Sequence, residues 1–176
     1  MLYQPSSHSG CFAAPEANID GWWVAHGNVV SAKQLWANHS DVSILLAGEC
    51  FTTLKRDQEA IFQLYQEAPD RFPIDLNGLF GGLLVDRKRG KAFLFNDRYG
   101  YERIYFHVKD DGFYFASEAK ALLRVLPELS QLDEEGLAQF IPYGCTQEWR
   151  SLFRGIHSLP DGSLFQLESG LRREEQ

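Results

Sequence analysis

The order of segments along the chain predicts an α+β domain. Strand-like segments joined by tight turns occupy the middle of the sequence, and helix-like segments with an apolar stripe stand before and after them. Separated strands and helices of this kind place helices on the outer faces of antiparallel sheets. A four-layer α-β-β-α sandwich is compatible with this order. A two-layer arrangement is compatible too, because periodicity alone does not separate them.

The strands are indicated by continuous apolar runs or by alternation between turn residues. Ser43–Ala47 is an apolar run ending at Gly48, which suits a strand buried on both faces. Shorter runs at Trp22–Ala25 and Ser163–Leu167 also predict strands, residues 1–21 read as a loop, and residues 31–41 are ambiguous. Four segments with short turns between them predict antiparallel hairpins: Leu79–Asp86, Lys91–Asn96, Arg103–Val108 and Gly112–Ala116.

Three segments predict helices. In the first, apolar residues at i, i+3, i+4 and i+7 (Ile61, Leu64, Tyr65 and Ala68) make one stripe, and Pro69 and Pro73 follow it. The second covers Glu118 to Leu126. The third starts at Asp133, a favourable N-cap, and runs through Ile141 to a stop at Pro142.

Composition narrows the class of function. The chain has 176 residues, a net charge of −7 and 44% hydrophobic residues, which together suggest one globular domain. We expect no nucleic-acid partner, because no basic cluster is present. We expect no membrane partner and a cytoplasmic location, because there is neither a signal peptide nor an apolar run of about 18 residues. Three widely spaced cysteines and five scattered histidines give no disulfide framework and no metal-ligand spacing.

The motifs between Asp75 and Leu123 carry a family resemblance. Leu76–Phe80 and Val85–Arg87 precede the turn Asp97-Arg98-Tyr99-Gly100, and Ala116–Leu122 reads Ala-Ser-Glu-Ala-Lys-Ala-Leu. This succession closely resembles the class II glutamine amidotransferase domain of asparagine synthetases. The resemblance covers residues 43–167, and residues 20–42 only loosely. It implies the N-terminal-nucleophile fold, in which two antiparallel sheets lie between helix layers, with the domain at residues 1–168 and a linker at 169–176.

The resemblance also implies a chemistry. In that family an N-terminal cysteine attacks the side-chain amide of L-glutamine, and the ammonia released passes to a C-terminal synthetase domain. ATP and Mg are expected in that synthetase domain, and no cofactor is expected in this one. By resemblance, Ala47 and Gly48 occupy the oxyanion-hole positions, and Glu49 and Asp57 occupy positions that bind glutamine.

Three positions depart from the family pattern. Leu2 stands where the nucleophilic cysteine is expected, and the first strand of the fold is missing. Ala47 replaces the oxyanion-hole asparagine, which leaves the Gly48 amide as one donor. The arginine expected shortly after His26 is absent, and Asn28 stands in that stretch. The last two changes lie inside the chain and indicate a degenerate site.

Structural roles compete with these assignments. Asp57 also suits an N-cap, and Glu49 also suits a solvated residue after a strand. Asp97 and Arg98 are expected to form a structural turn and an ion pair.

The cysteines are not expected to take part in catalysis. Cys11 has no free amine beside it, and Cys50 and Cys145 suit small buried residues. Gly81 and Gly82 predict a close backbone approach or a bulge.

Three hypotheses follow. The domain hydrolyses glutamine with a cysteine encoded upstream. Alternatively, it is a non-catalytic docking or regulatory module of an amide-forming ligase. A third hypothesis is an independent hydrolase that exposes Ser6, Ser7 or Ser9 at a mature N-terminus. The sequence does not decide whether the protein forms a homodimer.

Overall fold

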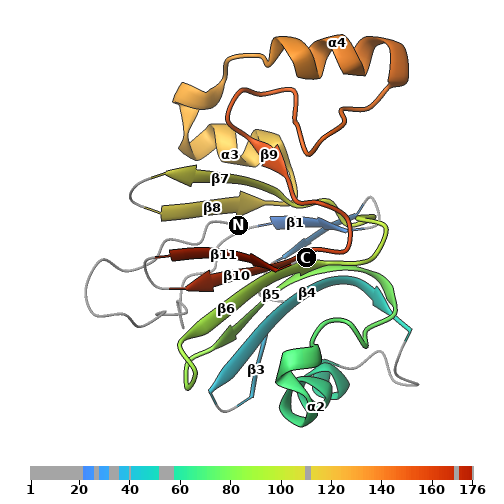
Figure 1. The fold of residues 1–176 in the computed structure, drawn as a ribbon, viewed down its shortest axis with the longest axis vertical. Coiled ribbons are helices and arrows are strands. Elements are labelled where there is room, and N and C mark those ends of the chain that lie inside the picture. The colour runs from blue at the N-terminus through green and yellow to red at the C-terminus, as the bar shows by residue number, and fades with distance from the viewer. Residues whose placement is uncertain are drawn as a thin grey trace.

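The computed structural model describes residues 22–25, 28–31, 36–39, 41–51, 58–109, 112–168 and 171–175. Among these residues, four strands precede α2, four strands follow it, and α3 and α4 come before the last three strands (Figure 1). Their bounds are β1 Trp22–Ala25, β2 Asn28–Ser31, β3 Trp36–His39, β4 Val42–Cys50, α2 Gln58–Glu67, β5 Gly78–Asp86, β6 Lys91–Asn96, β7 Tyr105–Lys109, β8 Gly112–Ala116, α3 Ala119–Val125, α4 Glu134–Tyr143, β9 His157–Ser158, β10 Leu164–Glu168 and β11 Leu171–Glu175, with short 3-10 turns at Pro69–Arg71 and Pro127–Leu129.

Every strand pairing in the described part of the chain is antiparallel. One sheet has the order β11-β10-β6-β5-β4-β3, a second has the order β8-β7-β9, and β1 pairs with β2. The predicted hairpins β5–β6 and β7–β8 are confirmed, with Leu83 opposite Leu94 in the first and Phe106 opposite Phe115 in the second.

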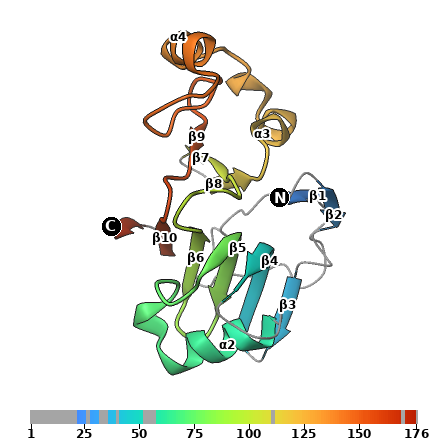
Figure 2. The ribbon, with the colours of Figure 1, turned by 90° about the vertical axis from the view of Figure 1, so that its right-hand side faces the viewer.

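The fold has four layers, so the α-β-β-α arrangement is correct and the two-layer alternative is wrong. Helix α2 covers the outer face of the six-stranded sheet, and α3 and α4 lie beyond the three-stranded sheet (Figure 2). Three apolar clusters fill the interfaces. Ile44 and Phe95 pack with α2, Leu45 and Phe115 lie between the sheets, and Leu122 packs with the outer face of β8.

Strand β4 shows how the sequence produces these layers. Successive side chains of a strand point to opposite faces. Ile44 belongs to the cluster under α2, and Leu45 belongs to the cluster between the sheets. Both are fully buried, as expected for a continuous apolar run.

The ends of two elements differ from the prediction. Helix α4 continues through Pro142 to Tyr143, because a proline in the last turn removes only one helical hydrogen bond. Gly144 then ends the helix in the left-handed conformation, and its N–H donates to the Phe140 carbonyl at 2.8 Å. The tail was expected to have no regular structure, but residues 171–175 form β11, which pairs with β10.

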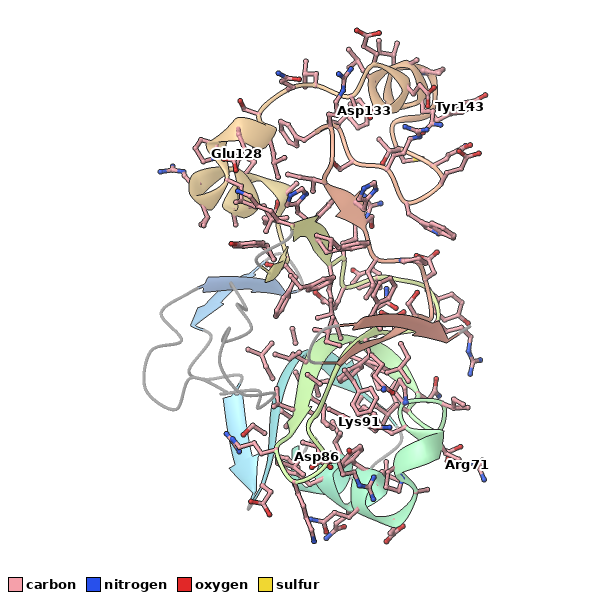
Figure 3. The ribbon with its side chains drawn as sticks, turned by 60° about the vertical axis from the view of Figure 1, so that its left-hand side comes forward. Arg71, Asp86, Lys91, Glu128, Asp133 and Tyr143 are labelled. Carbon is pink, nitrogen blue, oxygen red and sulfur yellow. The ribbon has the colours of Figure 1, made fainter. Side chains whose placement is uncertain are left out.

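A buried polar cluster ties α2 to the β5–β6 hairpin. The Tyr65 hydroxyl donates to Asp86 Oδ2 at 2.7 Å, and the Arg89 main-chain N–H donates to Asp86 Oδ1 at 2.9 Å. Burial, and next the hydrogen bond to Asp86, raise the pKa of Tyr65. Asp86 lies at the opposite end of the molecule from Asp133 and Tyr143 of the α4 region (Figure 3).

Candidate functional site

The predicted oxyanion-hole residues lie near the C-terminal end of β4. In the β4–β5 ladder Ala47 lies opposite Gly81, Gly48 opposite Phe80 and Glu49 opposite Leu79. The structure therefore brings Ala47, Gly48 and Glu49 together on one stretch of the central sheet.

The Ala47 side chain faces the layer between the two sheets. It is fully buried and belongs to the same cluster as Leu45, two residues earlier on the same face of β4. A side-chain amide at this position would have presented its N–H groups to that layer. The alanine methyl group that is present donates no hydrogen bond.

Gly48 occupies a backbone conformation that only glycine tolerates well. Its φ is +97°, and a Cβ atom added there would overlap the Leu79 carbonyl oxygen and lie 2.9 Å from the Phe80 Cα atom. Close approach of β4 and β5 therefore requires glycine, independently of catalysis.

The turn after β6 holds the β5 strand opposite Gly48. The Asp97 N–H donates to the Phe80 carbonyl at 2.7 Å, and the Phe80 N–H donates to Asp97 Oδ2 at 3.1 Å. Phe80 thus directs its main-chain groups toward Asp97. By the alternation of an antiparallel ladder, the Gly48 amide is expected to point away from β5. With this direction, the Gly48 N–H would be the main-chain hydrogen-bond donor of residues 47–49.

Asp97 is a structural residue, as predicted. Its carboxylate also accepts hydrogen bonds from the N–H groups of Tyr99 at 2.8 Å, Tyr101 at 3.1 Å and Glu102 at 3.5 Å. The expected ion pair is wrong, because Asp97 makes no ion pair with Arg98 among the described residues. Four backbone amides, counting Phe80, satisfy the buried carboxylate instead.

The remaining predicted site residues are only partly placed. Glu49 is half-buried and has an interaction partner. Leu2, Cys11 and Asp57 lie outside the described residues, and so does His26. Of Asn28 the structure describes the backbone as the first residue of β2. The roles assigned by resemblance to these positions remain predictions.

Other predictions from the sequence have mixed outcomes. A Cβ added at Gly82 would lie 2.5 Å from the Leu45 carbonyl oxygen, which confirms the predicted close backbone approach at this strand. Cys50 is buried, and its Sγ atom lies 3.5 Å from the Asn77 carbonyl oxygen. Cys145 is only partly buried, so its assignment to the core is wrong. It lies on a surface loop, where apolar packing is incomplete.

Sequence reasoning missed a cavity elsewhere in the molecule. A space of about 640 Å³ lies beside the loop of residues 145–150 and the start of β10, away from Ala47 and Gly48. Its lining includes Arg103 and Trp149, and Trp149 is 53% exposed. Tryptophan is more often a packing residue, so the sequence carried no signal for an exposed ring here.

Fold and site define a class of protein. Two facing antiparallel sheets between helix layers indicate the N-terminal-nucleophile hydrolase fold. The chain belongs to the glutamine amidotransferase domain family, which it matches over residues 25–176. It is a glutaminase-type domain that is similar to part of asparagine synthetases.

Similar proteins include three asparagine synthetases of Bacillus subtilis (strain 168). Asparagine synthetase [glutamine-hydrolyzing] 2 is 32% identical over 85 residues, which cover 48% of this chain and 11% of the relative. Asparagine synthetase [glutamine-hydrolyzing] 3 is 28% identical over 104 residues, which cover 58% of this chain and 17% of the relative. Asparagine synthetase [glutamine-hydrolyzing] 1 is 25% identical over 109 residues, which cover 62% of this chain and 17% of the relative. The chain thus spans less than a fifth of these relatives.

None of the helices in the described part of the chain has the length and apolar character that crossing a bilayer requires. Within the same residues, His, Cys, Asp and Glu side chains form no group of three or more that could hold a metal ion.

Proposed function

We propose that this domain keeps the glutaminase fold but has a degenerate glutaminase centre. The observation that carries the proposal is Ala47, whose methyl group is buried where the resemblance implies an asparagine amide. Loss of one oxyanion-hole donor typically lowers the rate by about 10²–10³-fold. The Gly48 amide alone supports little hydrolysis of L-glutamine to glutamate and ammonia.

By this proposal, the whole protein catalyses ATP-dependent formation of an amide. The relatives carry the name asparagine synthetase [glutamine-hydrolyzing], which associates this domain type with amide formation. A synthetase domain with bound ATP and Mg would then use free ammonia or another amine as its nitrogen source. L-Glutamine would bind this domain weakly or not at all.

Calorimetry tests the degenerate centre. L-Glutamine titrated into the folded chain is expected to give no saturable heat in the millimolar range. The variant Ala47→Asn supplies the side-chain amide. Ala47→Ser serves as its matched control, because the serine side chain is smaller than that of asparagine and lacks the amide. Binding of glutamine to the unmodified chain at millimolar affinity or tighter would sink the proposal.

Helix α4 supports a second role, that of a docking module for the synthetase domain. Among the residues of α4, all of which the structure describes, only Gly136 is buried. Leu137, Phe140 and Ile141 expose 37%, 42% and 75% of their surface, and Figure 1 shows α4 on the outer side of α3. An apolar helix without a core face is typical of a surface that a partner covers.

Replacement of exposed apolar residues tests this role. Phe140→Ser together with Ile141→Ser is expected to leave folding of the isolated chain unchanged and to weaken its association with the synthetase domain. Val125→Ser in α3, 43% exposed, is the matched control. If the α4 double variant and the Val125→Ser variant bind the synthetase domain equally well, α4 is not the docking surface.

A further inference from the structure

The cavity beside residues 145–150 has the size of a small-molecule site. Its volume is about 640 Å³, within the usual range of about 300–1,000 Å³ for ligand pockets. A smaller space of about 180 Å³ adjoins it and shares four lining residues, Arg103, Tyr105, Cys145 and Thr146.

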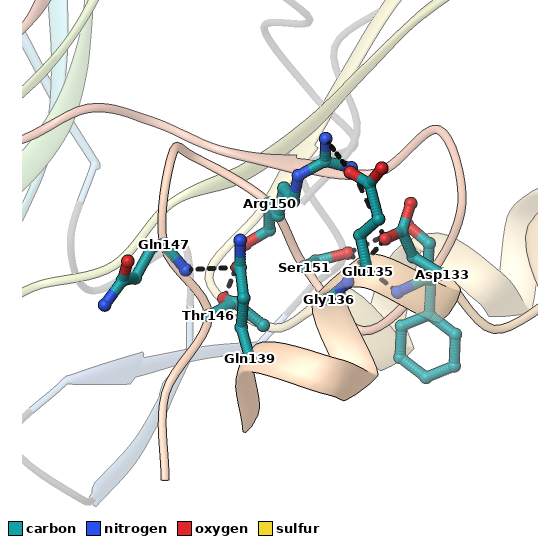
Figure 4. A network of polar contacts seen from close by, with 9 residues as sticks. Asp133, Glu135, Gly136, Gln139, Thr146, Gln147, Arg150 and Ser151 are labelled. Carbon is teal, nitrogen blue, oxygen red and sulfur yellow. Dashed lines mark hydrogen bonds and ion pairs between the residues drawn. The ribbon is translucent and has the colours of Figure 1, made fainter. Parts of the chain in front are cut away.

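The loop over this cavity is held in place by polar contacts with α4. The Arg150 guanidinium forms ion pairs with Asp133, at 3.4 Å, and with Glu135 (Figure 4). The Gln147 N–H donates to Gln139 Oε1 at 2.9 Å. The loop is therefore positioned before any ligand binds, which reduces the entropy lost on binding.

Two neighbouring residues of this loop are strained. Glu148 and Trp149 have φ values of +54° and +62°, which are uncommon for side chains larger than asparagine. The Ser158 N–H donates to the Trp149 carbonyl at 2.8 Å and helps to hold this conformation. Strain that the surrounding contacts maintain is often found at ligand sites.

The lining combines three kinds of binding group. Arg103 is exposed and has no ion-pair partner among the described residues, whereas Arg150 is already paired. A guanidinium suits a phosphate or carboxylate. Trp149 offers an aromatic face, on which a base stacks favourably. Glu148 and Asp161 offer carboxylates, which commonly accept hydrogen bonds from ribose hydroxyls.

We propose that the cavity binds a nucleoside monophosphate, with the phosphate at Arg103, the base on Trp149 and the ribose near Glu148 or Asp161. An inorganic anion alone would leave the indole of Trp149 unused. An aromatic compound without an anion would leave Arg103 unpaired. This site is separate from the glutamine site, because Ala47, Gly48 and Glu49 take no part in its lining.

Binding of AMP to the purified chain tests the proposal, with calorimetry and tryptophan fluorescence as the two readouts. We expect saturable binding with a Kd on the order of 1 mM or tighter. Adenosine and inorganic phosphate, each tested alone, should bind at least about tenfold more weakly, because each uses only part of the site. Equal binding of phosphate and AMP would overturn the nucleotide assignment.

Variants locate the site. Arg103→Gln should weaken AMP binding about tenfold or more and leave adenosine binding unchanged, whereas Trp149→Ala should weaken both. Arg124→Gln, an exposed arginine of α3 outside the cavity, is the matched control. Far-ultraviolet circular dichroism verifies that each variant is folded. No saturable AMP binding to the folded chain, or undiminished binding to the Arg103→Gln variant, would refute the proposal, and neither result bears on the glutamine site.

Discussion

Removal of the Asp97 carboxylate should destabilise the domain strongly, because four main-chain amides depend on it. Hydrogen bonds reach it from Phe80, Tyr99, Tyr101 and Glu102, over 2.8 to 3.5 Å. A hydrogen bond to a charged group contributes about 1.5–3 kcal/mol, but bonds that share one acceptor do not add. We expect Asp97→Ala to lower the free energy of unfolding by about 3–5 kcal/mol.

Asp97→Asn provides a graded comparison. Oδ2 accepts from Phe80, Tyr101 and Glu102, whereas Oδ1 accepts from Tyr99 alone. An asparagine with its carbonyl oxygen at the Oδ2 position keeps three of the bonds and loses one. The expected loss is therefore smaller, about 1–2 kcal/mol.

Urea unfolding followed by circular dichroism measures these differences. Asp75→Asn is the control for loss of a negative charge, because within the described part of the chain Asp75 makes only an exposed ion pair with Arg71. Such a pair contributes about 0–1 kcal/mol. If Asp97→Ala costs no more than Asp75→Asn, the reasoning that this carboxylate organises the turn is refuted.

Three further predictions concern stability. Tyr65→Phe should cost about 1–2 kcal/mol by removing the hydrogen bond to Asp86. Because the pKa of Tyr65 is raised above its usual 10.0, the unmodified protein should lose stability as the pH rises above that value, and equal alkaline slopes for protein and variant in urea titrations would contradict this. Gly48→Ala should cost clearly more than Gly90→Ala, because both have positive φ but only Gly48 meets atoms in place of a Cβ, and equal unfolding midpoints would disprove the overlap. Asp133→Ala removes the N-cap bond to the Gly136 amide and should cost about 1 kcal/mol, with faster hydrogen exchange in α4 and unchanged exchange in β6.

The sequence predicted the elements whose side chains face a core. The strand at Lys91–Asn96 agrees with the prediction at both ends, because apolar alternation and flanking turns define it. Strand β11 was missed because Leu171–Glu175 is mostly charged, and its pairing with β10 uses main-chain groups that carry no side-chain signal. Pro142 shows the same limit, since only its position within the last turn makes a proline tolerable in α4.

The candidate site was predictable only in part. Resemblance identified Ala47 and Gly48, but the direction of Ala47 into the layer between the sheets depends on how the layers pack. The cavity at Trp149 arises from a loop held by contacts between residues that are distant in sequence, such as Ser158 with Trp149. No local pattern encodes such a contact, so this site could not be predicted from the sequence.

The decisive measurement for a degenerate centre is the rate at which the protein, isolated from the cells that make it, releases glutamate from L-glutamine. Mass spectrometry of the same preparation identifies its N-terminal residue. We expect little release and, if the N-terminal residue is a cysteine, an increase of about 10²–10³-fold on Ala47→Asn. Glutamate release at a rate that Ala47→Asn does not raise would contradict the claim that Ala47 makes this centre degenerate.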